Sequence, residues 1–532
     1  MTERLRFLPA GNDAFLVELA DLDTTLTLLD ALIADRPHGI SELVPAARTL
    51  MVSFDPQLTT RRRLIDSICA IDLSVRSSRQ GDTHEIPVVY DGEDLTDVAQ
   101  LLGQTVEEVV RRHSQATYTV AFTGFAPGFA YMTCDDPTLD VPRRKSPRVR
   151  IPAGSVALGG KFSGIYPSDS PGGWQLLGRT PLKMWDTARN PAALLAPGDR
   201  VRFRPVSEAA VTSVDDARDH KPLTSPIAAA IEVTRADRPA LFQDSGRFGR
   251  ASQGVSGSGA LDRRSLVEAN LCVGNTRDTP ALEITLGGFA LKVARPVTVA
   301  VTGAPCPLSI RTVDGRTVQA RPGRPFALDA GDELTLDYPS EGMRSYLALR
   351  GGFHVDRVLG SASTDTLAKV GPAPIVAGTV LSPADMPVGA VDPFQTEIEP
   401  LPRTGETVAL DILLGPRTDW FTETGLATLI GQEWAVTAES SRVGVRLSGS
   451  EPIERRDDAE LLSEGTVRGA IQVPHSGQPV LFLSDHPLTG GYPVIGVVAR
   501  HHLELAGQIP IGAKIRFNAV ADFDPLFRET DR

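Results

Sequence analysis

Cysteine is scarce in this chain of 532 residues. The four cysteines, Cys69, Cys134, Cys272 and Cys306, form no Cys-x-x-Cys pair and have no histidine at ligand spacing. This spacing excludes a disulfide-stabilised scaffold and a structural zinc site. A lone cysteine without a visible base is best interpreted as a small buried apolar residue.

Aromatic residues are also few, with 4 Trp, 7 Tyr and 19 Phe, whereas there are 48 Gly and 41 Pro. This balance favours many short strands joined by tight turns over long packed helices. An apolar fraction of 41% with 23% charged residues is typical of a soluble globular protein. The length suggests roughly three or four domains.

No long run of Lys or Arg interrupts the net charge of −12. Nucleic-acid binding needs a basic stripe that neutralises phosphates, so this class of function is excluded. No apolar run reaches the roughly 20 residues that cross a bilayer, and the N-terminal residues lack the apolar core of a secretory signal. We therefore expect a cytoplasmic protein that binds neither nucleic acid nor membrane.

Hydrophobic periodicity predicts a mainly β chain with an α+β start. Strands alternate with amphipathic helices near the N-terminus, and a helix ended by Gly103 precedes a second helix capped by Thr105. The predicted segments are residues 1–82 (a small ferredoxin-like α+β domain), 83–205 (a β-barrel), 206–228 (a linker), 229–385 (the first barrel of the second half), 386–404 (a connector) and 405–525 (its second barrel).

One sequence pattern occurs twice. Residues 168–178 read SDSPGGWQLLG and residues 484–496 read SDHPLTGGYPVIG, and each is followed by a Gly-led strand, GDRVRF or GAKIRF. A third such ending, GDELTL, closes part of the middle region. Repeated final strands of this kind indicate related β-barrel modules rather than a solenoid.

Long motifs in the first half include FTGFAPGFAYM (122–132), SPRVRIPAGSVALGG (146–160) and GIYPSDSPGGWQLLGRTPLKMWD (164–186). Over about residues 5–205 the chain resembles the B subunit of bacterial 5-oxoprolinase, the family also called allophanate hydrolase subunit 1 or the Kip kinase-inhibitor family.

The second half carries QDSGRFGRASQGVSGSGALD (243–262), LEITLGG (282–288), SEGTVRGAIQVPHSGQPV (463–480) and TGGYPVIG (489–496). Over about residues 230–522 it resembles the C subunit of the same enzyme. The two resemblances together imply a fusion of both subunits, cyclophilin-like β-barrels, and kinship with the carboxyltransferase region of urea carboxylase.

The repeated Gly-Gly-aromatic hairpins are the predicted site. Glycines expose backbone N–H groups that can hold carboxylate, carbamate or phosphate oxygens, arginines can grip an anion bidentately, and aromatic walls exclude water. A simpler alternative stays open, in which the glycines only make tight turns and the arginines cover the barrel surface. The predicted catalytic residues are Asp485, Gln472 and Arg179, and the predicted substrate-binding residues are Arg148, Arg150, Gly172, Gly173, Trp174, Gln243, Asp244, Arg247, Asp262, Arg446, Thr489, Gly490, Gly491 and Tyr492.

We also predict that both hairpins border one cleft between the two halves, because related barrels commonly pair about a pseudo-twofold axis. No metal site is predicted, since His475, His486 and the pair His501–His502 lack a carboxylate at ligand spacing. His113 lies on an apolar helix face and is expected to be a hydrogen-bonded core histidine.

The resemblance implies three alternative functions. The first is the B and C part of 5-oxoprolinase, which opens a lactam with ATP together with a separate A subunit of the LamB/YcsF type. The second is a carboxyltransferase that acts on urea or a related amide, with biotin supplied on a separate carrier because the chain has no biotin-acceptor motif. The third is a regulatory protein that inhibits a kinase. ATP is expected to be shared with a partner protein, the substrate is a small amide or lactam, and homo-oligomerisation is left open.

Overall fold

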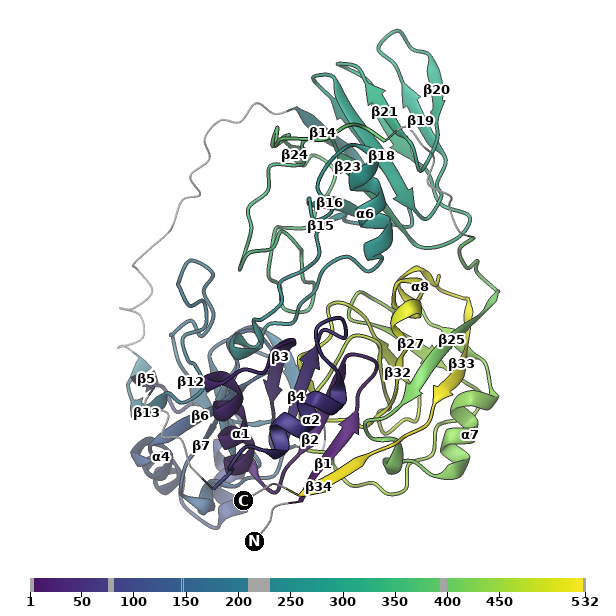
Figure 1. Cartoon of the computed structure of the whole chain (residues 1–532). Helices are drawn as coiled ribbons and strands as arrows, with labels where there is room; N and C mark the ends of the chain where they lie inside the picture. Colours follow the sequence, from purple (N-terminus) through teal and green to yellow (C-terminus); the bar gives the residue numbers. More distant parts are fainter. Residues whose placement is uncertain are drawn as a thin grey trace.

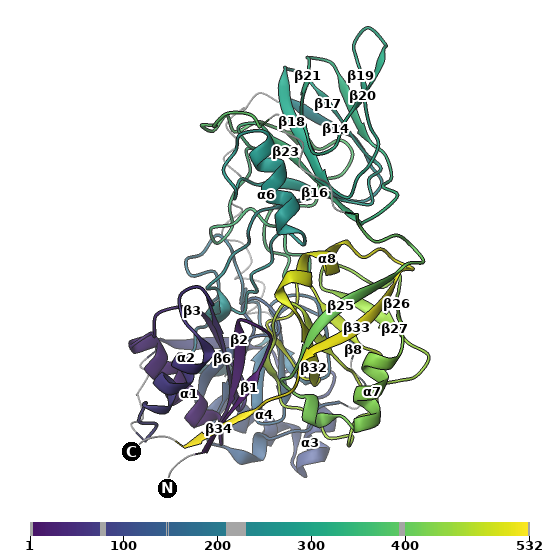
Figure 2. The ribbon, with the colours of Figure 1, turned by 45° about the vertical axis from the view of Figure 1, so that its right-hand side comes forward.

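A computed structural model describes residues 4–74, 81–144, 146, 148–208, 230–392 and 400–529. Strands predominate in these residues, which confirms the mainly β prediction, and they form four units in chain order (Figure 1). The first, second and fourth units lie together in the lower part of the view, and the third unit lies above them (Figures 1 and 2). Among the described residues no helix is long and apolar enough to cross a membrane.

The first unit is an antiparallel sheet covered by two helices. Its elements are β1 (Arg4–Pro9), β2 (Ala14–Glu18), α1 (Leu22–Ala34), β3 (Ile40–Pro45), β4 (Thr49–Phe54) and α2 (Arg61–Cys69). The helices begin where they do because Asp21 and Thr60 accept hydrogen bonds from the backbone N–H groups of the first turn. A ferredoxin-like unit runs β-α-β-β-α-β, and this unit has the same order when it is read cyclically from β2.

The sheet of the first unit is completed from the other end of the chain. The last strand, β34 (Leu526–Glu529), pairs antiparallel with β1, so the sheet order is β3-β4-β2-β1-β34. The first and last described strands therefore lie side by side near the bottom of Figure 1.

The second unit is a seven-stranded sheet with a helical pair. Its elements are β5 (Thr83–Val88), α3 (Leu95–Leu102), α4 (Val106–Gln115), β6 (Tyr118–Thr123), β7 (Ala130–Thr133), the 3-10 helix η1 (Pro137–Leu139), β8 (Arg148–Ile151), β9 (Ser155–Gly159), β10 (Phe162–Ile165), β11 (Ser170–Gly172), β12 (Gln175–Arg179) and β13 (Arg200–Pro205). Gly103 ends α3 in a left-handed conformation and Thr105 caps α4, as predicted. His113 is fully buried and hydrogen-bonded to Tyr90 and Ser163, which confirms it as a core histidine.

The third unit consists of two sheets packed around one apolar core. Its elements are β14 (Ile231–Ala236), β15 (Leu241–Gln243), η2 (Ala251–Gln253), α6 (Arg263–Cys272), β16 (Ala281–Thr285), β17 (Phe289–Val293), β18 (Val297–Gly303), β19 (Leu308–Arg311), β20 (Thr317–Ala320), β21 (Pro325–Leu328), β22 (Glu333–Leu336), β23 (Arg344–Leu349) and β24 (Val380–Leu381). The sheets run β20-β19-β22-β17-β14-β24 and β15-β16-β23-β18-β21. The predicted helical insertion is α6, which Asp262 caps.

The fourth unit is a closed barrel of order β25-β32-β29-β30-β27-β26-β33. Its elements are β25 (Thr407–Leu414), η3 (Thr418–Trp420), α7 (Glu423–Gly431), β26 (Trp434–Val436), β27 (Gly444–Ser448), β28 (Glu464–Gly465), β29 (Ala470–Gln472), β30 (Val480–Phe482), β31 (Thr489–Gly490), β32 (Val494–Val498), η4 (Arg500–His502), α8 (Leu503–Gln508) and β33 (Lys514–Ala521).

The repeated sequence pattern corresponds to a repeated structure. GDRVRF forms β13, which pairs in parallel with the first strand of the second unit, and GAKIRF forms β33, which pairs in parallel with the first strand of the fourth. GDELTL forms β22, whose neighbours are both antiparallel, so it is not a third copy. Residues 209–228 of the predicted linker 206–228 lie outside the described residues. Residues 393–399 of the predicted connector also lie outside them.

The first and fourth units form a tight interface. Arg417 of the fourth unit binds two carboxylates, Glu464 of its own unit and Glu18 on β2, with Arg417 Nη2 lying 3.0 Å from Glu18 Oε1. Leu8, Leu16 and Met51 of the first unit share an apolar cluster with Leu488 of the fourth. The N-terminal unit is therefore packed against the C-terminal barrel rather than being an appendage.

Candidate active site between the two halves

A cavity of about 450 Å³ lies between the second and fourth units. Gly172, Gly173 and Trp174 line it from one unit, and the Gly490–Gly491–Tyr492 segment lines it from the other. The two copies of the repeated pattern therefore face one space, where the sequence predicted them. Each hairpin is held by a small accessory sheet, β11 with β8 in the second unit and β31 with β28 in the fourth.

The wall from the second unit is a packed group of aromatic rings. The ring of Phe129 lies 5.3 Å from those of Trp174 and Tyr166, and the ring of Tyr131 lies 5.5 Å from that of Trp174. Such edge-to-face pairs hold one another in fixed orientations. Gly172 is required here because a Cβ at this position would lie 2.4 Å from Tyr166 Oη.

The wall from the fourth unit depends on Gln472, which supports the hairpin from behind. Its Nε2 donates a hydrogen bond of 3.0 Å to Tyr492 O, and a Cβ at Gly490 would lie 2.6 Å from the same nitrogen. Gln472 is buried and does not line the cavity. The geometry therefore gives this predicted catalytic residue a positioning role.

The two walls meet at the loop that follows β6. Phe125 lines the cavity with a φ of 63°, a left-handed conformation that is uncommon for a residue with a side chain. Its backbone N–H donates to Thr489 Oγ1 at 3.2 Å. This contact fixes one wall relative to the other.

Three arginines reach the cavity, and two of them are already paired. Arg144 Nη1 lies 2.5 Å from Asp94 Oδ1, and Arg455 Nη1 lies 3.0 Å from His475 Nδ1. Arg143 also lines the cavity, but it forms no ion pair or hydrogen bond with the described part of the chain. Its charge acts instead on two cavity tyrosines, Tyr131 and Tyr166, whose ionised forms it favours.

Tyr131 and Tyr166 are two phenols that line the cavity. Burial raises the pKa of Tyr131 above the ordinary value, while Arg143 and hydrogen bonding to Ser463 and Thr489 act in the opposite direction. Burial likewise raises the pKa of Tyr166. At neutral pH both phenols are therefore neutral hydrogen-bond donors, suited to a carbonyl or carboxylate oxygen.

The arginines predicted from the sequence lie elsewhere. Arg148 binds Asp94 in a bidentate pair, Arg150 binds Asp169 at 2.6 Å, and Arg179 binds Asp91 at 2.8 Å as well as Glu208. None of the three lines the cavity. Arg148 still acts on the site indirectly, because Asp94 also holds Arg144 and accepts a hydrogen bond from Leu176 N.

Asp485 is fully buried at the junction of the third and fourth units, away from the cavity. Burial opposes its ionisation, but bidentate contact with Arg442 outweighs burial and keeps its pKa below the ordinary value. Nearby Asp365 has its pKa raised to about 7 by burial and by the charge of Asp485. This pair forms part of an inter-unit ionic network, and Arg446 lies on the barrel strand β27 outside the cavity.

The Gly-rich loop residues are also structural. Gln243 donates to Thr364 O, Asp244 accepts from Ser361 and Ser363, and Arg247 donates to Ser363 O. All three predicted residues are buried. They tie the loop to the segment 361–364 and do not reach the cavity.

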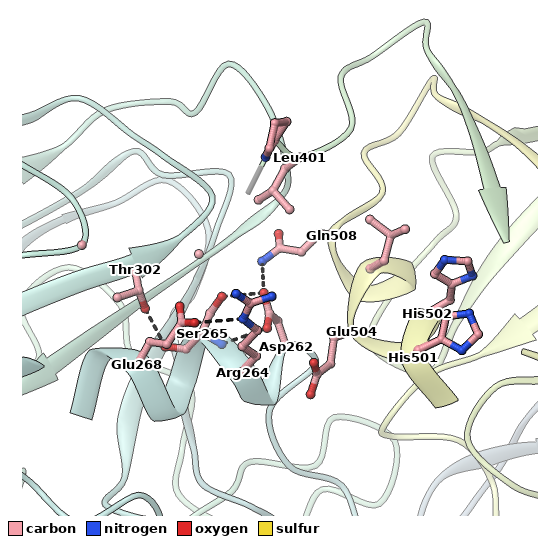
Figure 3. A pocket seen from close by; sticks show the side chains of 14 residues that line it. Asp262, Arg264, Ser265, Glu268, Thr302, Leu401, His501, His502, Glu504 and Gln508 are labelled. Carbon is pink, nitrogen blue, oxygen red and sulfur yellow. Dashed lines mark hydrogen bonds and ion pairs between the residues drawn. The ribbon is translucent and has the colours of Figure 1, made fainter. Parts of the chain in front are cut away.

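Asp262, the last residue predicted from this loop, belongs to a second cavity of about 400 Å³ between α6 and α8 (Figure 3). Its carboxylate accepts hydrogen bonds from Ser265 N, Ser265 Oγ and Gln508 Nε2. Gln508 Oε1 in turn accepts from the N–H groups of Met343 and Arg344. Because these polar groups satisfy one another, we place the candidate active site in the first cavity.

Sequence reasoning missed the cavity residues Arg143, Arg455, His475 and Ser463. Arg143 stands five residues before Arg148 in the same basic stretch, so the signal was present but gave no means of choosing among the arginines. Ser463 and His475 lie inside the motif 463–480, but nothing in that motif singled them out, and Arg455 precedes it without a motif of its own.

Comparison with known proteins is consistent with this geometry. Residues 253–519 match the family described as carboxyltransferase domain, subdomain A and B, and residues 5–195 match carboxyltransferase domain, subdomain C and D. The chain therefore belongs to the carboxyltransferase-domain family and joins both parts of that domain in one polypeptide, which confirms the predicted fusion.

The relatives are enzyme components. The second half is similar to the C subunit of 5-oxoprolinase from Escherichia coli, at 36% identity over 54% of this chain and 90% of the relative. The first half is similar to the B subunit of 5-oxoprolinase from Bacillus subtilis, at 33% identity over 39% of this chain and 95% of the relative. Urea amidolyase of Lachancea kluyveri is 30% identical over 58% of this chain and 17% of its own length.

A solved structure covers both halves at once. The crystal structure of TTHA0988 is similar over 95% of this chain and 99% of its own, with 34% identity and a TM-score of 0.82. The arrangement of the two halves in one chain therefore has an experimental counterpart.

Proposed function

We propose that this chain is the fused B and C component of a 5-oxoprolinase, which converts 5-oxoproline to glutamate together with a separate A subunit of the LamB/YcsF type. The observation that carries this proposal is the cavity between the two halves. Arg143, an arginine without a protein partner in the described part of the chain, lines this cavity together with the packed aromatic rings of Phe129 and Trp174. The names of the relatives, the B and C subunits of that enzyme, support the same assignment.

The substrate is small and has two parts, a carboxylate and a flat five-membered lactam ring. Arg143 is the group that suits the carboxylate, because a guanidinium without a protein partner can make a charge-assisted contact with it. Trp174 and Tyr492 are placed to enclose the ring and exclude water. Tyr131 can then donate a hydrogen bond to the lactam oxygen, where negative charge develops when the ring is opened.

The cavity does not fit ATP. A triphosphate needs several cations or a phosphate-binding loop, whereas of the described arginines that line this cavity only Arg143 is without a protein partner. The sequence has no P-loop motif either. We therefore assign nucleotide binding to the LamB/YcsF-type partner.

Reconstitution tests the proposal. The purified chain should release little glutamate from 5-oxoproline and ATP, and adding its cognate LamB/YcsF-type partner should restore release. Full activity without a partner would overturn the need for that second protein. Absence of activity with the partner, under conditions where both proteins form a complex, would overturn the assignment itself.

Carboxyl transfer to urea or a related amide is the second candidate, and the family description and the urea amidolyase relative favour it. The same cavity would take a carboxylated biotin ring against Trp174, with the biotin carried on a separate protein. Carboxylation of urea that depends on a carboxybiotin carrier, with no glutamate release in the reconstitution above, would select this candidate over the first.

A further inference from the structure

Three potential metal ligands meet on the outer face of the fourth unit. Asp411 lies on β25, and His501 and His502 lie on the short η4 turn that leads into α8. One ligand atom from each of the three residues lies within 4.8 Å of the others. Figure 3 shows the two imidazole rings side by side next to α8, and both histidines line the cavity that also contains Asp262.

The carboxylate of Asp411 is already oriented toward the histidines. Its Oδ1 accepts a hydrogen bond of 2.8 Å from Asn518 Nδ2 on the neighbouring strand β33. Its Oδ2 lies 2.9 Å from His501 Nε2 and 3.9 Å from His502 Nδ1. A carboxylate fixed through one oxygen by a neighbouring amide is the outer-shell arrangement that orients ligands in metal sites.

The distances suit a small ion. Bonds of about 2.0–2.2 Å to nitrogen and oxygen place the ligand atoms of a tetrahedral zinc ion about 3.3 Å apart. The two observed separations from Oδ2, 2.9 and 3.9 Å, lie on either side of that value. His502 Nδ1 also accepts a hydrogen bond from the Asp411 backbone N–H at 2.9 Å, which an ion bound at this nitrogen would replace.

We propose that Asp411, His501 and His502 bind one divalent transition-metal ion of the kind that prefers imidazole, such as Zn²⁺. Two imidazoles and one carboxylate supply three ligands, which leaves the fourth tetrahedral position to water or another ligand. His501 is 61% exposed in its side chain, so an ion can reach the site without opening the fold.

The proposal differs from the sequence prediction that no metal is bound. The two histidines are adjacent in the chain, but the carboxylate is 90 positions away from His501. Motif spacing cannot detect a ligand set that is assembled by the pairing of β25 with β33 and by the position of η4. The site is separate from the cavity between the halves and does not depend on the proposed function.

Titration of the full chain, prepared without an affinity tag and treated with a chelator, tests the proposal. Isothermal titration with Zn²⁺ should show one site, and Co²⁺ should give visible absorption bands from a bound ion. His501→Ala and Asp411→Asn should each weaken binding at least ~10-fold, and Asn518→Ala should weaken it by roughly 10-fold through loss of orientation. His38→Ala, which removes an exposed histidine far from this site in sequence, should change nothing.

Because the side chain of His501 is exposed, His501→Ala should fold normally, and an unchanged melting temperature of the metal-free variant checks this point. No binding by the wild-type chain would overturn the proposal. Binding that survives unchanged in both His501→Ala and Asp411→Asn would also overturn it, because the ion would then be held by other residues.

Discussion

The hydroxyl oxygen of Thr489 accepts a hydrogen bond from the backbone N–H of Phe125 at 3.2 Å, although 364 positions separate the two residues. One belongs to the repeated hairpin of the second half, and the other to the loop after β6 in the first half. The neighbouring Gly124 packs against the same side chain, since a Cβ there would lie 2.6 Å from Thr489 Oγ1. The two halves therefore pack so closely beside the candidate active site that one added methyl group at Gly124 would clash with Thr489.

Adding that methyl group should disturb the site. Gly124→Ala should destabilise the chain by about 1–3 kcal/mol through overpacking and lower turnover. In the double variant Gly124→Ala/Thr489→Ala the combined loss should be smaller than the sum of the single losses, because the second change removes the clash. Gly431→Ala is the matched control, since a Cβ there meets nothing within 4 Å. Additive losses, measured by thermal unfolding, would show that the two residues do not interact.

Arg143→Ala should lower kcat/KM for a carboxylate-bearing substrate in the reconstituted enzyme. Loss of one charge-assisted contact of about 1.5–3 kcal/mol corresponds to a decrease of roughly 10- to 100-fold. The exposed Arg316→Ala serves as the control for a general charge effect. Arg179→Ala should leave kcat/KM nearly unchanged, because Arg179 lies outside the cavity. A decrease in kcat/KM as large as that of Arg143→Ala would instead support the catalytic role that the sequence predicted for Arg179.

Separately produced halves should assemble. Fragments 1–208 and 230–532, expressed together, should co-elute on gel filtration, because β34 completes the sheet of the first unit and Arg417 binds Glu18 across the interface. Deleting residues 525–532 should weaken this association. Elution of two independent fragments would contradict the interface between the first and fourth units.

Stability should fall on mild acidification because of His113. Burial lowers the pKa of this imidazole from 6.5 to about 3 in the folded protein. The unfolded chain therefore binds more protons between pH 6.5 and about 3, and the free energy of unfolding decreases as the pH falls through this window, by at most about 1.4 kcal/mol per pH unit. His113→Gln should reduce the difference in melting temperature between about pH 7 and about pH 5. An unchanged difference would show that other groups cause it.

Local elements of the fold could be predicted because their signals are local. The helix caps at Thr105 and Asp262 and the glycine at 103 lie within a turn of the helices that they delimit. The sequence does not predict β3 because Glu42 and Pro45 interrupt its apolar pattern, and the half-buried Glu42 carboxylate accepts a hydrogen bond from Ala251 N of the third unit, a contact that no local pattern records. The pairing of β34 with β1 was missed because no local pattern records a contact between the two ends of a chain.

The site was predictable to the extent that it is repeated. Two copies of one Gly-Gly-aromatic pattern identified both walls of the cavity, but the charged residues were chosen by their nearness in sequence. Arg148, Arg150 and Arg179 each found a carboxylate on a neighbouring segment, which the sequence does not show. Arg143 differs from them only in having no such partner among the described residues.

The sequence by itself determined the strand-rich composition, the helix ends, the hairpins and the family, because each depends on residues close together in the chain or on long motifs. The tertiary structure decided which arginine remains available, that Asp485 is buried in an ion pair with Arg442, and that Asp411 lies beside His501. A side chain's charge is available for binding only if no partner neutralises it. That partner can come from any part of the chain, so folding alone fixes it.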